Sequence, residues 1–144
     1  MIRQIDDSVL REIAKPVNIM ATEIQELLND MVETMEYNHG IGLEAPQIGI
    51  SLRLIVLKVE NVTYKLINPE IISSMGKQNS QEGCLSLSDR SGIVRRPERV
   101  VVKALNEFGE EIEIIGRFLL ACCLSHEIDH LNGVLFIDKL KLDT

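Results

Sequence analysis

The chain has 144 residues, of which 45% are apolar and 26% are charged, so we expect a single domain over residues 1–144 with one hydrophobic core. Fifteen Lys and Arg stand against 22 Asp and Glu, and this net charge of -7 argues against nucleic-acid reading, because phosphate contacts depend on Lys and Arg. No apolar run approaches the length that crosses a bilayer, and the N-terminus lacks the apolar core of a signal peptide, so we expect a cytoplasmic protein without membrane contact.

The first part of the chain predicts two helices. Residues 7–14 suit a short helix that ends before Pro16, because proline disfavours helical geometry in the residue before it. Between Ile24 and Met35 the apolar residues recur three and four positions apart, which predicts a helix over residues 22–37.

The middle of the chain predicts strands, because it holds short segments rich in Val, Ile and Leu. Asn68-Pro69 separates two of these segments, and residues 106–109 suit the turn of a hairpin between the last two. The predicted strands are residues 52–59, 62–67, 70–73, 99–105 and 111–115.

Residues 118–131 predict a helix that is apolar on most faces, and such a helix is buried. Asn132-Gly133 follows it as a stop signal. Helices, then strands, then a buried helix indicate an α+β fold, with mostly antiparallel strands packed around that last helix.

The strongest functional motif lies inside this buried helix, in the run from His126 to His130. Residues four apart share one face of a helix, so both imidazoles can bind one metal ion, and Glu127 can take a proton from metal-bound water. Burying two histidines with two acids is costly unless they bind something. The motif therefore predicts a metal site with His126 and His130 as ligands.

Such a site needs a third protein ligand, and Cys84 is the candidate. The chain has three cysteines, an odd number, and in a reducing compartment disulfides are not expected. A metal-bound cysteine is therefore an alternative to consider. A free cysteine is more often a small buried hydrophobe, however, and Cys122 and Cys123 on the apolar helix fit that alternative better than Cys84 does.

A third segment runs from Gly40 to Gln47. Its spaced glycines allow unusual backbone torsions or the close approach of another chain, although alone it suits an ordinary turn. It lacks the Gly-Lys-Ser or Gly-Lys-Thr ending of a phosphate-binding loop.

Taken together and in this order, the three segments resemble the peptide deformylase family. That family carries Gly-x-Gly-Leu-Ala-Ala-Pro-Gln, Glu-Gly-Cys-Leu-Ser and Gln-His-Glu-x-Asp-His, and residues 40–47, 82–86 and 126–130 are similar to them. The resemblance covers roughly residues 4 to 140. It implies an enzyme that hydrolyses the N-formyl group from the initiator methionine of nascent peptides.

The resemblance also implies the metal and its ligands. Cys84, His126 and His130 would hold one divalent ion, with water as the fourth ligand. The expected ion is Fe2+, and Zn2+ or Ni2+ are alternatives that ligand type alone does not separate.

Catalytic roles follow from the same resemblance. Glu127 would act as general base toward water and then as general acid toward the departing amine. The backbone N–H of Leu85 and the side-chain amide of Gln47 would stabilise the oxyanion together with the metal.

The implied substrate is an extended N-formylmethionyl peptide whose backbone pairs with Ile41 and Gly42. The methionine side chain would enter an apolar pocket beside the metal helix, and the ribosome near its exit tunnel is an expected partner. Further candidate substrate-binding residues are Gly83, Leu119, Cys122 and Cys123.

Residues around the motifs carry further expectations. We predict an Arg96–Asp129 ion pair that braces the strand after Cys84 against the metal helix. The chain departs from the family at Glu44, Ser88 and Ser125, where the family has Ala, Pro and Gln. A Glu44 side chain turned into the site would alter substrate preference or rate, whereas one turned outward would change little.

Two rival functions remain open on the residues alone. A small metal-dependent peptidase or amidohydrolase shares the His-Glu helix, but peptidases of that kind usually take a third ligand downstream, where only Asp138 and Asp143 are available as acids. A non-enzymatic paralogue would keep the fold as a binding module, although the retained Cys84, histidines and Glu127 speak against it.

Overall fold

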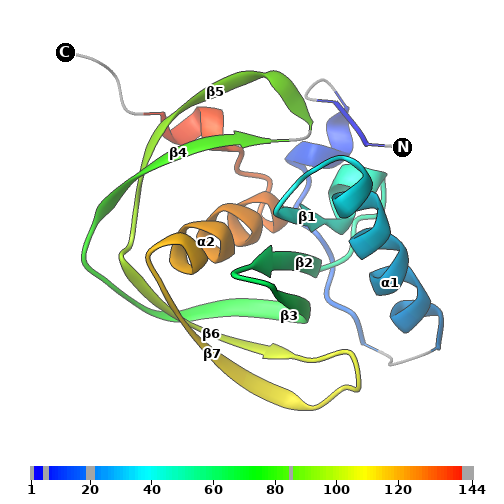
Figure 1. The fold of residues 1–144 in the computed structure, drawn as a ribbon. Coiled ribbons are helices and arrows are strands. Elements are labelled where there is room, and N and C mark those ends of the chain that lie inside the picture. Colours follow the sequence, from blue (N-terminus) through cyan, green and yellow to red (C-terminus); the bar gives the residue numbers. More distant parts are fainter. Residues whose placement is uncertain (1, 5–6, 19–21, 85, 141–144) are drawn as a thin grey trace.

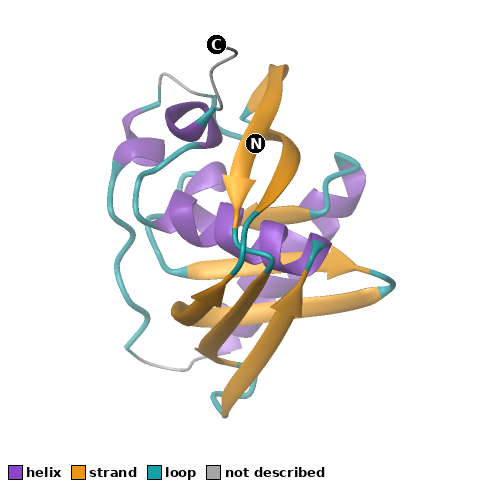
Figure 2. Cartoon of the chain, turned by 90° about the vertical axis from the view of Figure 1, so that its left-hand side faces the viewer, coloured by secondary structure: helices purple, strands orange, loops and turns teal. Residues whose placement is uncertain are grey.

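The computed structural model describes residues 2–4, 7–18, 22–84 and 86–140. Helix α2 (Leu119–Leu131) runs between two antiparallel sheets, as Figures 1 and 2 show. The larger sheet has the strand order β1-β2-β3-β6-β7, and the smaller pairs β4 with β5. The expected α+β class, with antiparallel strands around a buried helix, is confirmed.

The strands of the larger sheet include all those that the sequence predicts. β2 is buried at five of its six positions because both its faces are covered, which explains its nearly continuous apolar run. The β6–β7 hairpin is confirmed at its predicted place. The strands are β1 (Gly42–Glu44), β2 (Leu54–Val59), β3 (Val62–Met75), β6 (Arg99–Leu105) and β7 (Glu111–Arg117).

The predicted separation of two strands at Asn68-Pro69 is wrong, because β3 continues through both residues. The register toward β6 shifts between Ile67 and Glu70, so the break is a bulge within one strand. Asn68 takes a positive φ of 52°, and its side-chain amide exchanges two hydrogen bonds of 2.8 Å with the backbone of Val17. The side chain of Asn68 thereby ties the bulge to the segment that precedes α1.

The smaller sheet consists of β4 (Gln78–Cys84) and β5 (Leu87–Arg96). Hydrophobic patterning does not predict β4, because the side chains on its buried face are Ser80 and Glu82 rather than apolar residues. This polar strand covers α2 from the side opposite the larger sheet and ends at Cys84 (Figure 1).

The helices follow the predictions closely except at the N-terminus. Helix α1 (Thr22–Tyr37) has the predicted bounds and packs Leu28 and Met35 against β1 and β2. The short helix predicted over residues 7–14 is a single 3-10 turn, η1 (Ser8–Arg11). It stops early because Ala14 donates its N–H to Leu131 (2.8 Å), which requires extended backbone. Further 3-10 turns are η2 (Ala45–Ile48) and η3 (Phe136–Lys139).

Helix α2 is apolar because it fills the space between the sheets. Leu124 and Ile128 lie in a cluster with side chains of β2 and β6, and the helix is followed by Gly133 with a positive φ of 75°. No helix among residues 2–4, 7–18, 22–84 and 86–140 is long and apolar enough to cross a membrane.

Candidate metal centre and active site

Three potential metal ligands converge where β4 ends beside α2. His126 and His130 lie one helical turn apart on α2, and their ring centroids are 4.5 Å from each other. The Cys84 sulfur and one nitrogen of each ring all lie within 4.8 Å of one another. The convergence that the sequence predicts is confirmed, and the arrangement suits a single ion.

The chemistry of these donors fits a divalent transition metal. The Nδ1 atoms of His126 and His130 both face a buried carboxylate, which leaves their Nε2 atoms for an ion. Nε2 of His130 is buried and has no hydrogen-bond partner among the residues that the structure describes. One sulfur and two imidazole nitrogens are a donor set suited to Zn2+ or Fe2+.

The carboxylate beside His126 is Glu82, two residues before Cys84 on β4. Its Oε1 lies 2.7 Å from His126 Nδ1 and 2.8 Å from Arg96 Nη2, and Oε2 accepts from Arg96 Nε at 2.8 Å. Arg96 Nη1 also donates to Asp129 at 2.6 Å, which confirms the predicted ion pair. Burial alone raises the pKa of Glu82, but hydrogen bonds and charge from Arg96 and His126 lower it to about 2.

The carboxylate beside His130 is Glu44, at the end of β1. Its side chain is turned into the site and fully buried, and Oε1 lies 2.8 Å from His130 Nδ1. Burial raises the pKa of Glu44 to about 7. The sequence raised an inward Glu44 as one of two alternatives, and its contact with His130 was not predicted.

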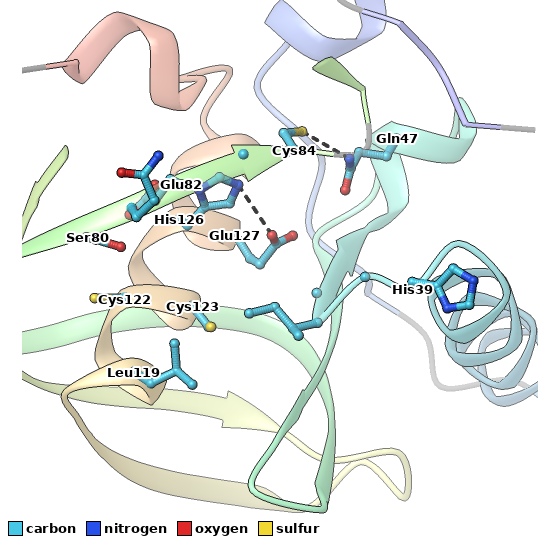
Figure 3. A pocket seen from close by; sticks show the side chains of 15 residues that line it. His39, Gln47, Ser80, Glu82, Cys84, Leu119, Cys122, Cys123, His126 and Glu127 are labelled. Carbon is cyan, nitrogen blue, oxygen red and sulfur yellow. Dashed lines mark hydrogen bonds and ion pairs between the residues drawn. The ribbon is translucent and has the colours of Figure 1, made fainter. Parts of the chain in front are cut away.

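The expected acid–base residue, Glu127, is buried beside the ligands. Its Oε1 lies 3.6 Å from His126 Nε2, and its Oε2 has no hydrogen-bond partner among the described residues (Figure 3). Burial, followed by the neighbouring charge of Glu44, raises the pKa of Glu127. A Cβ at Gly42 would stand 3.1 Å from Glu127 Oε1 and 3.0 Å from the Leu57 side chain, so a larger residue there would press on the acid–base candidate.

The Cys84 thiol is poorly disposed to ionise without a cation. Burial, followed by the charges of Glu44 and Glu127, raises its pKa. Because the thiolate is the form that binds metal, an ion entering here must displace the thiol proton.

The structure describes only one of the two expected oxyanion donors. Leu85 lies outside the described residues. Gln47 is buried, and its amide lies between Glu44 on one side and Cys84 with Ser86 on the other. In one orientation the amide N–H donates to Cys84 Sγ at 3.3 Å, and in the other it donates to Glu44 Oε2 at 2.7 Å while Ser86 donates to the amide oxygen at 3.2 Å.

A pocket opens beside the ligands, and Figure 3 shows Leu119, Cys122 and Cys123 along the part of its wall that α2 forms. Ser80 also lines the pocket and was not predicted. Burial raises the pKa of Cys123 to about 12, so its thiol is an uncharged wall of the pocket. The structure thus brings all the predicted substrate-binding residues to this pocket: Ile41, Gly42, Gly83, Leu119, Cys122 and Cys123.

The remaining departures from the family pattern are Ser125, on α2, and Ser88. Ser125 is buried, and its Oγ has no hydrogen-bond partner among the described residues. Ser88 belongs to β5, and its side chain lies outside the described part of the chain.

Comparison with known proteins points in one direction. The sequence pattern of the polypeptide deformylase family matches residues 1–144. The peptide deformylase of Acetivibrio thermocellus is 49% identical over 139 residues, which cover 96% of this chain and 82% of that protein. The peptide deformylase of Alkaliphilus metalliredigens is 51% identical over 140 residues, which cover 97% of this chain and 95% of that protein.

Solved structures agree. The peptide deformylase of Thermotoga maritima superposes with a TM-score of 0.96 at 40% identity, covering 99% of this chain and 97% of that one. A peptide deformylase from Synechococcus elongatus, solved in complex with actinonin, superposes with a TM-score of 0.96 at 41% identity, covering 99% of this chain and 79% of that one.

Proposed function

The chain belongs to the peptide deformylase family, and from this premise we propose that Glu127 is the acid–base residue of its reaction. The enzyme has peptide deformylase activity, with formylated nascent peptides as its substrates. A single observation carries the assignment of the site: Cys84, His126 and His130 converge, with Glu127 beside them.

The ion that Cys84, His126 and His130 would hold supplies Lewis-acid chemistry, polarising a carbonyl oxygen and making water a better nucleophile. Glu127 accepts a proton from the attacking water and delivers it to the nitrogen of the departing peptide. The bond from the formyl carbon to nitrogen breaks, and formate and a free amine leave. The position of Glu127 supports this role, because its buried carboxyl group lies beside the ligands, with Oε1 3.6 Å from His126 Nε2.

We assign oxyanion stabilisation to the Gln47 amide and the Leu85 backbone N–H. The position of Gln47 beside Cys84 Sγ supports its part, since a donor there faces the reaction centre. The family resemblance supports the part of Leu85.

The peptide backbone is proposed to pair with Ile41 and Gly42. Strand β1 supports this proposal because it lies at the edge of the larger sheet, paired on one side with β2, so its other side can accept an added strand. The methionine side chain would then enter the pocket that Leu119, Cys122, Cys123 and Gly83 line.

We propose Fe2+ as the native ion, with Zn2+ and Ni2+ as substitutes that the same ligands can hold. Because the substrates are nascent chains, we propose that the enzyme works in the cytoplasm near the exit tunnel of the ribosome.

The test is formate release from a formyl-Met tripeptide by protein loaded anaerobically with Fe2+. The Glu127→Ala variant is expected to lose about 100-fold or more of kcat/KM, the usual contribution of a positioned acid–base group, while holding one ion. Glu113→Ala, an exposed glutamate on β7, serves as the matched control and is expected to keep parental activity.

Equal activity of parent and Glu127→Ala would overturn the acid–base assignment. Parent protein that carries one ion but releases no formate would instead favour a binding module, and release of free methionine from unformylated peptides would favour a peptidase.

A further inference from the structure

We propose that Glu44 is a positioning residue of the metal centre: its buried carboxylate holds the His130 ring by Nδ1 and the Gln47 amide beside it, which directs His130 Nε2 at the ion. This inference rests on the proposed function of the site. It concerns a residue that departs from the family pattern, where alanine stands at this position.

The first argument is the matching support of the two histidines. His126 Nδ1 lies 2.7 Å from Glu82, and His130 Nδ1 lies 2.8 Å from Glu44. A ligating imidazole that donates its second N–H to a carboxylate is held in one tautomer and one ring orientation. Alanine in place of Glu44 has no oxygen, so His130 would lose this acceptor.

The second argument is that Glu44 reaches Gln47 as well. Gln47 follows Glu44 by three residues within η2, and in one amide orientation its N–H lies 2.7 Å from Glu44 Oε2. One carboxylate therefore contacts a metal ligand with one oxygen and, in that orientation, the Gln47 amide with the other; in the alternative orientation the same N–H donates to Cys84 Sγ instead. A change at Glu44 is expected to act on both metal affinity and kcat.

The third argument is the burial of Glu44. Its side chain is 0% exposed, a costly place for a carboxyl group unless its oxygens have partners. His130 and Gln47 are such partners. Glu44 also lies close to Glu127, and these two acids with His130 form a group that could alternatively hold a second ion. That alternative makes a different prediction for the number of ions bound.

The experiment compares Glu44→Gln, which keeps an oxygen that can accept from Nδ1, with Glu44→Met, which fills the space without one. Metal affinity is measured by titrating Co2+ into metal-free protein against a chelator and following the visible absorption of the bound ion. We expect Glu44→Met to bind about 10- to 100-fold more weakly and to show an altered spectrum, the usual cost of losing such a partner. Glu44→Gln should restore most of the affinity.

A second readout needs neither metal nor activity. Imidazole 1H–15N correlation spectra of the metal-free parent are expected to show His130 protonated at Nδ1, and Glu44→Met should shift it toward Nε2 protonation. In the formate assay, the loss in Glu44→Met should fall on kcat more than on KM. Glu70→Gln, an exposed glutamate on β3, is the control that should leave all readouts unchanged.

Several outcomes would overturn the proposal. They are an Nε2-protonated His130 in the parent, a Glu44→Met protein with parental Co2+ affinity and spectrum, or two ions bound per chain. The His130 tautomer in the parent decides the matter even if Glu44→Met does not fold. A parent that binds one ion with the expected tautomer but releases no formate would refute the proposed function and leave the positioning role standing.

Discussion

The two histidine ligands are supported by carboxylates of opposite electrostatic character. Glu82, behind His126, lies in a bidentate pair with Arg96, and its pKa is lowered to about 2. Glu44, behind His130, has no Lys or Arg within ion-pair distance among the described residues, and burial raises its pKa to about 7.

Glu82 and Glu44 thus make the same contact with a histidine Nδ1 atom, but within the described part of the chain only Glu82 has a cation beside it. A hydrogen bond to Nδ1 needs only an acceptor, and both carboxyl groups provide one. At Glu82 the cation of Arg96 compensates the charge of the carboxylate. Glu82 is therefore expected to be ionised at any pH where the protein folds. The Glu44 side is expected to change its proton content near neutral pH.

The largest expected effect comes from removing the cation beside Glu82. Arg96→Met leaves the buried Glu82 carboxylate without its cation and removes one of the two cations beside half-buried Asp129, and it should lower the free energy of unfolding by about 3–5 kcal/mol. Urea unfolding at pH 7 measures it. Adding Glu82→Gln should recover part of the loss, because it removes one uncompensated charge.

Arg95→Met is the matched control, since Arg95 is the exposed neighbour whose guanidinium contacts Asn79. Its free energy of unfolding should change by less than about 0.5 kcal/mol. Arg96→Met protein as stable as Arg95→Met protein would refute the structural role of the network.

A smaller expected effect is that the stability contributed by Glu44 and that contributed by Glu82 depend on pH in opposite ways in metal-free protein. The folded pKa of Glu44, about 7, exceeds its ordinary value of 4.5, so the stability it contributes is present below pH 4.5 and is lost as pH rises through 7. Between pH 4.5 and 7, Glu44→Gln should therefore gain stability relative to the parent, by at most about 3 kcal/mol. Urea unfolding at several pH values measures this difference.

Glu82 should behave in the opposite way. Its folded pKa, about 2, is below 4.5, so its contribution is present above pH 4.5 and is lost as pH falls toward 2. Glu82→Gln should thus lose stability relative to the parent as pH rises from 3 to 4.5. Parallel pH profiles for the two variants would show that the sites do not differ as described.

The smallest expected effect comes from removing the more exposed of the two cations that contact Asp129. Asp129 Oδ2 lies 2.6 Å from buried Arg96 and 3.0 Å from half-exposed Lys139. Lys139→Ala should lower the free energy of unfolding by less than about 1 kcal/mol, because solvent screens an exposed pair. Thermal unfolding would detect a larger loss, which would place Lys139 in the buried network.

Apolar spacing was sufficient where a segment buries an apolar face. Helix α1 has its predicted bounds, and the β6–β7 hairpin lies where it was expected. The motif on α2 predicted two ligands because a four-residue spacing determines which side chains share a helix face. Apolar spacing failed at β4, whose buried face carries Ser80 and Glu82, because the patterning rule assumes that buried means apolar.

The functional site likewise contains residues that the sequence indicated and residues that only the tertiary structure placed. Residue type and local spacing indicated His126, His130 and Glu127 as candidate site residues, and the family resemblance indicated Cys84 and the Arg96–Asp129 pair. Only the tertiary structure decided that Glu44 turns inward, and that it supports His130 from a strand 86 positions away in the sequence. The direction of a side chain depends on which chain segments pack around it, and the pKa of a carboxyl group depends on the cations and solvent that this packing leaves beside it.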